Sequence, residues 1–176
     1  QSRAPSGDIT AGLPAELIAK LREVVQKTEN VGTRFPEEAR RILDPVLQRM
    51  MDGALLDRGS IPLRARELMI LRTCARCGAE YEWGVHIAVF GAKAQWTPTQ
   101  LRSSVHGRPS DECWSEEDRL VMRLADQLHD TSEVEDTLWT ELSARFAADQ
   151  LVELIMLAGL YHAVSYVINA TRIQHE

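Results

Sequence analysis

The sequence carries many signals for the starts and ends of helices and none for β-strands, and this feature most constrains what the chain can fold into. Prolines stand where helices begin, glycines stand where they end, and apolar residues between them recur at three- and four-residue spacing. Alternating β-branched runs and Asn-Gly turns, which would indicate hairpins, are absent from the sequence. The pattern therefore predicts an all-α protein.

The first half of the chain is expected to supply two covering helices and one central helix. The covering helices should begin at Pro14 and Pro36, and Pro45 should kink the second of them. The central helix should begin at Pro62, because its segment Leu68–Leu71 is apolar almost all round and must be buried on every side.

The second half of the chain is expected to add further helices. Gly78 should end the central helix, and the next helix should run over 79–94 with acidic residues in its first turn. Later helices should begin at Pro98, at a capping box that opens with Ser115, and after Ser132, and Asp149 should cap a long final helix. About seven to eight helices are expected in all.

Length and charge restrict the function classes. A chain of 176 residues is expected to form a single domain, and its 44% hydrophobic content is that of a protein with a packed core. A net charge of −6 and the lack of a basic run make nucleic acid a poor partner. The apolar run over 151–168 carries a Glu and a His, so we expect a buried helix rather than a membrane span.

Three cysteines are too few for a secreted disulfide framework, so we expect a cytoplasmic protein. The first residues show no signal peptide, although a first residue other than Met leaves open a leader that has been removed.

Glu82 and His86 form the first candidate for catalysis. Residues four apart lie on the same face of a helix, and a carboxylate beside an imidazole can fix its tautomer for proton transfer near neutral pH. The alternative is a solvated pair that only supports the helix. Glu67 is a further candidate because it borders an apolar segment, and its alternative is a surface ion pair with Arg64, Arg66 or Arg72.

Cys74 and Cys77 form a Cys-x-x-Cys, the spacing of many redox disulfides. They fall at the predicted end of a helix, where the dipole disfavours a thiolate, so two buried core cysteines are the alternative. We predict no metal site, because Glu82 and His86 lack the further ligands that one needs. Secondary candidates are Tyr161, His162 and His129. Their alternative is a role as satisfied core or end-cap residues, although His162 could also face a pocket.

Two stretches of the sequence together resemble a known family. Residues 66–72 (RELMILR), followed by 78–86 (GAEYEWGVH), resemble the carboxymuconolactone decarboxylase and alkylhydroperoxidase D superfamily, with similarity from about residue 35 to the C-terminus. The resemblance implies one helical domain of the alkylhydroperoxidase D type, with residues 35–176 as its core and 1–34 as a helical extension. It also implies a homo-oligomer: a dimer, a trimer or a hexamer.

The peroxidase branch of that superfamily carries a Glu, eleven further residues, and then Cys-x-x-Cys-x-x-x-His. Placed on His86, that pattern matches Glu67, but its two cysteine positions fall on Ala79 and Glu82. The cysteines of this chain lie five residues earlier, and a shift of five residues turns a pair to another helix face. We therefore expect no peroxidase activity of the usual kind.

The decarboxylase branch resembles Glu-x-x-x-His at this place, as in Glu82 and His86. The resemblance implies a cofactor-independent acid–base enzyme that decarboxylates or isomerises a small oxygenated organic acid or lactone. His86 would move the proton, Glu82 and Glu67 would support it, and Tyr81, Trp83 and His162 would contact substrate. Two alternatives stay open: a peroxide or thiol oxidoreductase that uses Cys74 and Cys77, and a non-catalytic helical oligomer that binds a ligand.

Overall fold

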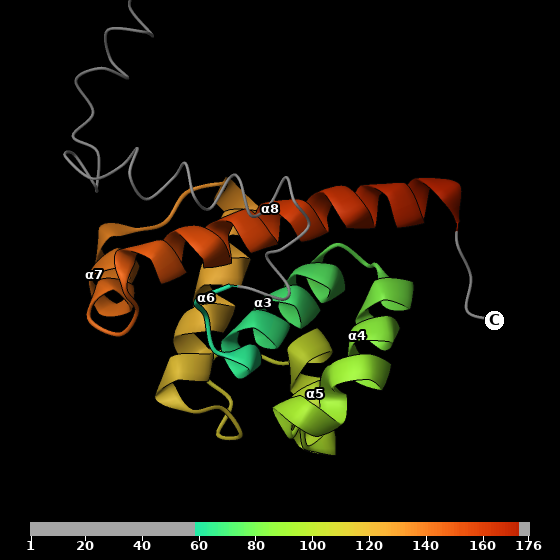
Figure 1. Ribbon diagram of the computed structural model, residues 1–176, viewed down its shortest axis with the longest axis horizontal. Helices are drawn as coiled ribbons and strands as arrows, with labels where there is room; N and C mark the ends of the chain where they lie inside the picture. The colour runs from blue at the N-terminus through green and yellow to red at the C-terminus, as the bar shows by residue number, and fades with distance from the viewer. Residues whose placement is uncertain (1–58, 173–176) are drawn as a thin grey trace, which may run out of the picture. The chain divides into compact units, whose positions relative to one another are not determined.

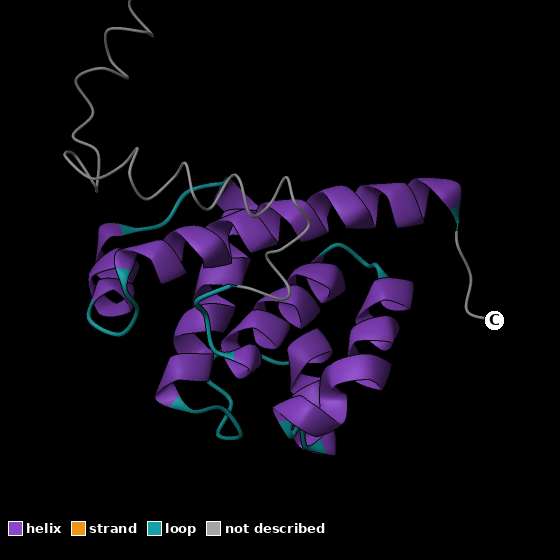
Figure 2. Ribbon diagram, viewed as in Figure 1, coloured by secondary structure: helices purple, strands orange, loops and turns teal. Residues whose placement is uncertain are grey.

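A computed structural model describes residues 59–172, and every regular element among them is a helix (Figure 2). These residues belong to one compact unit, which spans 40–176. The predicted all-α class is confirmed. The helices expected from Pro14 and Pro36, the kink at Pro45 and the extension over 1–34 lie outside the described residues.

Six helices are described, in the order given in Figure 1. They are α3 (Leu63–Arg76), α4 (Glu80–Ala94), α5 (Pro98–His106), α6 (Glu116–Thr131), α7 (Asp136–Ser143) and α8 (Ala148–Thr171).

Helix α3 is the central element of the described unit. It packs against α4, α5, α6 and α8, and the four residues over 68–71 are at most 1% exposed. An apolar surface all round is what burial on every side requires. Around α3 the core gathers large side chains from α6, α7 and α8: Val121, Met122, Leu124, Leu138, Leu142, Leu151, Leu154 and Leu157.

Three ion pairs align α3 with α6. Arg64 pairs with Asp118, Arg72 with Asp126 and Arg76 with Asp130, so each pair joins residues 54 positions apart. A constant offset means that the two helices run in the same direction. Arg72 is 4% exposed and also donates to the carbonyls of Ser104 and Gly107, so it links α3, α6 and the end of α5.

The junction between α3 and α4 is a tight reversal at Gly78. Its φ is +66°, the left-handed region that favours glycine. The Ala79 N–H donates to the carbonyl of Cys74 at 2.9 Å, and the Gly78 N–H donates to that of Ala75 at 3.1 Å. These two bonds are the Schellman pattern that ends a helix. The prediction that Gly78 ends the helix is confirmed.

The other predicted helix starts are confirmed in part. Thr97, before Pro98, and Ser115 each accept a hydrogen bond from the backbone N–H three residues on and form capping boxes. The expectation for Asp149 is wrong, because α8 begins one residue earlier. There, the side chain of Gln150 accepts from the N–H of Ala147 at 2.9 Å and takes the capping role.

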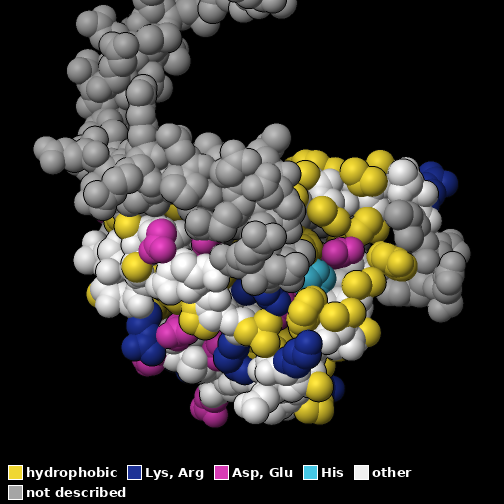
Figure 3. Space-filling view, viewed as in Figure 1, with side chains coloured by type: hydrophobic (Ala, Val, Ile, Leu, Met, Phe, Trp, Pro, Cys, Tyr) yellow, Lys and Arg dark blue, Asp and Glu magenta, His cyan; other side chains and the backbone are white. Residues whose placement is uncertain are grey.

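Helix α8 is long and apolar enough to cross a membrane by length and composition, and half of its most apolar window is buried in the helical fold. The large apolar side chains that α8 leaves exposed are Tyr166 and Val167, and those that α4 leaves exposed are Val85 and Val89. Figure 3 shows hydrophobic side chains over this end of the unit. Exposed apolar groups that gather on one face are typical of contact surfaces.

Candidate functional site

The site is built on the α3–α4 reversal, because that turn lays α4 against α3. Helix α4 buries only two of its residues, His86 and Ala94. Across from it, Glu67 of α3 is fully buried. A buried carboxylate and a buried imidazole must find polar partners, because burying either group alone costs several kcal/mol. Removing one partner of a buried ion pair lowers stability by about 3–5 kcal/mol. The sequence thus places one obligate polar pair at this helix crossing.

His86 lies between Glu67 and Tyr161. Its Nδ1 is 2.8 Å from Oε2 of Glu67, and its Nε2 is 2.8 Å from the hydroxyl of Tyr161 on α8. A carboxylate only accepts, so the hydrogen-bond network assigns the ring proton to Nδ1. The Nε2 lone pair is then left to accept from the tyrosine hydroxyl. The three side chains form a continuous path for a proton.

Two further contacts hold this path in position. Arg66 donates to Oε1 of Glu67, with nitrogen–oxygen distances of 2.8 and 2.9 Å, so both carboxylate oxygens are bonded. Phe90 stacks on the His86 ring at a centroid distance of 5.5 Å, and Tyr161 meets that ring edge-on at 5.1 Å. The imidazole is fixed by packing as well as by hydrogen bonds.

Glu82 is the more accessible acid of the site. Its Oε1 is 3.5 Å from Nε2 of His86, and its side chain is 18% exposed, against 5% for His86 and none for Glu67. Nε2 therefore has two oxygen neighbours, a buried phenol and a partly exposed carboxylate. The predicted four-residue spacing does bring Glu82 and His86 together, and the solvated pair that was its alternative is excluded by the burial of His86.

Tyr161 keeps its proton. Burial raises the pKa of its hydroxyl, and the negative charge of Glu82 raises it further. The phenol thus acts as a hydrogen-bond donor to Nε2. From the sequence, Tyr161 is only a secondary candidate, and its signal is a hydroxyl-bearing side chain within the most apolar helix, which needs a buried partner.

The three residues predicted to contact substrate, Tyr81, Trp83 and His162, lie in different surroundings. Trp83 is half-buried, and its Nε1–H donates to the hydroxyl of Ser104 on α5 at 3.2 Å. Tyr81 is half-buried in the first turn of α4. His162 lies beside His129 and Cys77, as described below. Contact of these three residues with a substrate stays a prediction. Of the arginines considered as ion-pair partners of Glu67, Arg66 does pair with it, but the pair does not lie at the surface, because Glu67 is fully buried. Arg64 and Arg72 pair with aspartates of α6 instead.

The two thiols of the Cys-x-x-Cys lie near this site but are not activated. Burial raises the pKa of Cys74 to about 12, and the carboxylate of Glu82 adds to the shift. Burial also raises the pKa of Cys77. The side chain of Ser165 on α8 interacts with both thiols and partly offsets the shifts. Because the thiolate is the reactive form of cysteine, both residues are poor nucleophiles at neutral pH.

A second polar cluster joins Cys77, His129 and His162. His129 Nδ1 is 3.1 Å from His162 Nε2 and 3.9 Å from the sulfur of Cys77. Burial lowers the pKa of His129, and the positive charge of Arg76 contributes to the shift. The three residues are far apart along the chain, so no local sequence pattern indicates that they meet. Cys77 and His129 lie at the ends of α3 and α6, and both approach the middle of α8 at His162.

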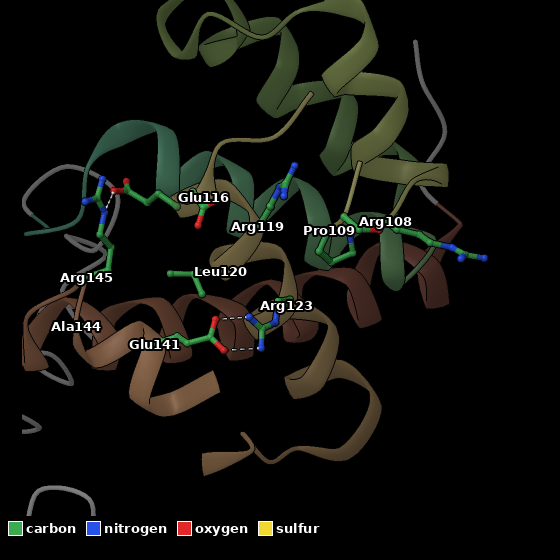
Figure 4. Close-up of a pocket in the computed structure, with 11 residues that line it drawn as sticks. Arg108, Pro109, Glu116, Arg119, Leu120, Arg123, Glu141, Ala144 and Arg145 are labelled. Atoms are coloured by element: carbon green, nitrogen blue, oxygen red, sulfur yellow. Dashed lines mark hydrogen bonds and ion pairs between the residues drawn. The ribbon is translucent and has the colours of Figure 1, made fainter. Parts of the chain in front are cut away.

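An arginine-rich pocket of about 930 Å³ lies elsewhere, between α6, α7 and the loop after α5 (Figure 4). Its arginines are partly neutralised within the pocket, since Arg123 pairs with Glu141 and Arg145 with Glu117. None of the residues of the Glu67–His86–Tyr161 site lines it. We therefore centre the candidate active site on His86.

Comparison with known proteins supports the fold. No family model and no curated protein matches the sequence. Among solved structures, the chain is similar to a protein of unknown function from Agrobacterium tumefaciens, whose description proposes an antioxidant defence protein AhpD. The two share 15% identity and a TM-score of 0.62, and the match covers 84% of this chain and 96% of the other. The described helices thus have the AhpD-like helical fold.

Proposed function

We propose that this protein is an acid–base enzyme that decarboxylates or isomerises a small oxygenated organic acid or lactone without an organic cofactor. The observation that carries the proposal is the buried chain of hydrogen bonds from Glu67 through His86 to Tyr161. The solvated helix pair considered for Glu82 and His86 would not hold the imidazole buried between a carboxylate and a phenol. A proton-transfer site needs a fixed tautomer and a donor at the far nitrogen.

In the proposed reactions, the protein's own part is to transfer protons. In decarboxylation, the bond between the substrate carbon and its carboxylate breaks, CO2 leaves, and the electron pair forms an enolate that takes a proton on carbon. In isomerisation, one carbon gives up a proton and another receives it. In both reactions Nε2 of His86 is the atom through which the proton passes, and Glu82 or Tyr161 exchanges it with the substrate.

Glu67 and Arg66 have supporting roles in this proposal. The Glu67 carboxylate stabilises the imidazolium that forms when Nε2 takes a proton, and Arg66 holds the carboxylate in place. This is the division of work by which a carboxylate orients a histidine in hydrolytic triads. The substrate itself would meet the more exposed side of the site, where Glu82 lies.

The test compares two variants with a matched control. His86→Gln removes the proton carrier, and Tyr161→Phe removes only the terminal hydroxyl. A Cys74→Ser/Cys77→Ser double variant is the control for the thiols. On a panel of small lactone acids, the first two variants should lose turnover and the control should keep it. Full turnover by His86→Gln on an accepted substrate would refute the assignment.

A thiol oxidoreductase is the second candidate function, and one observation favours it. The side chain of Ser165 lowers the pKa of both Cys74 and Cys77, so one hydroxyl acts on the two thiols. The reaction would convert two thiols and a hydroperoxide into a disulfide, an alcohol and water. The raised pKa of each thiol opposes it. Loss of two thiols after one equivalent of an organic hydroperoxide, measured by intact mass, would establish this function instead.

We also propose that the protein forms a homo-oligomer. The apolar side chains that α4 and α8 expose, Val85, Val89, Tyr166 and Val167, support this proposal. Light scattering on the wild-type protein and on Val89→Glu tests it. The wild type should exceed the monomer mass and the variant should dissociate, and a monomeric wild type would contradict the proposal.

A further inference from the structure

Three metal-ligating side chains converge where α3, α6 and α8 meet. Cys77 is the C-cap of α3, His129 lies in the last turn of α6, and His162 lies in the middle of α8. Their sulfur and nitrogen atoms all lie within 4.8 Å of one another. Each residue comes from a different helix, so the helix packing and not local sequence brings the three together.

His162 is already oriented to act as a metal ligand. Nδ1 of His162 is 2.9 Å from the carbonyl oxygen of Ala158, which can only accept. The ring proton is therefore assigned to Nδ1, and the Nε2 lone pair faces His129. A metal-binding histidine usually donates its other ring N–H to such an acceptor.

The spacing of the atoms is close to that of a tetrahedral site. Zinc–nitrogen bonds of about 2.0–2.1 Å and zinc–sulfur bonds of about 2.3 Å give edges of about 3.3 Å between two nitrogens and about 3.6 Å between nitrogen and sulfur. The observed separations are 3.1 Å for the two histidines and 3.9 Å for Cys77 and His129. The Cys77–His129 pair is slightly wider than a tetrahedral edge, and all three atoms lie within 4.8 Å of one another, so an ion would draw Cys77 towards the two histidines.

The cluster leaves room for a fourth ligand. A pocket of about 310 Å³ adjoins it and is lined by both histidines. Its other walls include Ser132, Ile155, Gly159 and Tyr166. Structural zinc sites are closed by four protein ligands, whereas sites with three protein ligands keep a position for water or a small molecule. This cluster belongs to the second type.

We propose that Cys77, His129 and His162 bind one Zn²⁺ ion whose fourth position opens into this pocket. Two imidazoles and one thiolate are ligands that suit zinc. On binding, the thiol of Cys77 loses its proton to solvent and its sulfur bonds to the metal, and the ring proton of His129 moves from Nδ1 to Nε2 so that Nδ1 can bind. The site stands apart from Glu67, His86 and Tyr161, so it can fail or hold independently of the proposed acid–base function.

Metal binding by the full chain is measured first by calorimetry with zinc chloride, after treatment with a chelator and a reductant. One equivalent should bind. With Co²⁺ as a spectroscopic probe, a thiolate-to-cobalt charge-transfer band and intense visible bands of tetrahedral cobalt should appear. Cys77→Ser should abolish the charge-transfer band, and His162→Gln should weaken zinc binding by more than about tenfold.

The matched controls are Cys113→Ser and His106→Gln, which change a cysteine and an exposed histidine outside the cluster. Both should bind zinc like the wild type. A measurement on the wild-type chain tests the proposal even if a variant fails to fold. In this measurement, zinc should protect Cys77 from alkylation while Cys113 reacts at an unchanged rate. Less than one equivalent of zinc on the wild type, or no protection of Cys77, would overturn the proposal.

Discussion

Replacing Glu67 by Gln changes one oxygen of a buried carboxylate into an NH2 group and leaves its shape intact. In the wild type both oxygens accept, one from Arg66 and one from Nδ1 of His86. An amide offers a single acceptor. If its oxygen faces Arg66, its NH2 faces Nδ1 and forces the ring proton onto Nε2, so the Tyr161 hydroxyl must accept from Nε2 and no longer donates to it. If it is turned round, its NH2 meets the guanidinium.

The first orientation takes the acceptor at Nε2 away from the Tyr161 hydroxyl, and the second brings two donors together. In both, the charge that balanced Arg66 is gone. Breaking a buried ion pair on one side costs about 3–5 kcal/mol. We expect the free energy of unfolding of Glu67→Gln to fall by that amount in urea titrations. Glu117→Gln removes the carboxylate of an ion pair with Arg145 whose side chains are 30% and 60% exposed, and should cost about 0.5 kcal/mol or less.

Nitrogen NMR of the histidine rings reports the second half of this prediction. Wild-type His86 should carry its proton on Nδ1, and the variant should shift it to Nε2 or show a mixture of the two forms. A loss of stability below about 1 kcal/mol together with an unchanged tautomer would refute the reasoning, because it would mean that Glu67 neither balances Arg66 nor orients His86.

Three further predictions concern single groups of the fold and the site. Tyr161→Phe keeps the buried ring and should cost about 1 kcal/mol of stability, measured in urea, while slowing proton exchange on a substrate carbon by about 10²–10⁴-fold; an unchanged rate would remove Tyr161 from the relay. Because burial raises the pKa of Cys74 from 9.0 to about 12, the folded chain keeps a proton that the unfolded chain releases above pH 9.0. The stability of the wild type should therefore fall relative to Cys74→Ala as the pH rises from 9.0 towards 12, and parallel curves would contradict the burial of this thiol. The Cβ that Gly78→Ala adds would meet no atom within 4 Å, so the only strain comes from the left-handed backbone conformation at this residue. The free energy of unfolding, measured by heat or urea, should fall by about 1–2 kcal/mol. An unchanged value would mean that the turn relaxes.

The helix boundaries were predictable wherever the signal is local. Gly78, Pro98 and Ser115 each act within four residues of themselves, and the structure confirms all three. Asp149 failed as a cap because Gln150, one residue on, reaches back to the N–H of Ala147 and starts the helix earlier. Two side chains able to cap the same turn cannot be ranked by residue type alone.

The site was predictable only where its members share a helix. Glu82 and His86 follow from four-residue spacing, and Glu67 was selected through its apolar surroundings and a resemblance. Tyr161 joins His86 from 75 residues away, and the approach of His129 to His162 depends on how α6 packs against α8. Contacts of this kind are set by tertiary packing, which periodicity within one helix does not encode.

The most direct test of the central claim is deuterium incorporation at carbon, followed by proton NMR on small lactone acids and related oxygenated acids in D2O. The account predicts enzyme-dependent deuterium at a substrate carbon, with or without loss of CO2. This incorporation should be absent with His86→Gln and retained in the Cys74→Ser/Cys77→Ser double variant. Incorporation that survives in His86→Gln, or hydroperoxide consumption that depends on Cys74 and Cys77 with no carbon exchange, would contradict it.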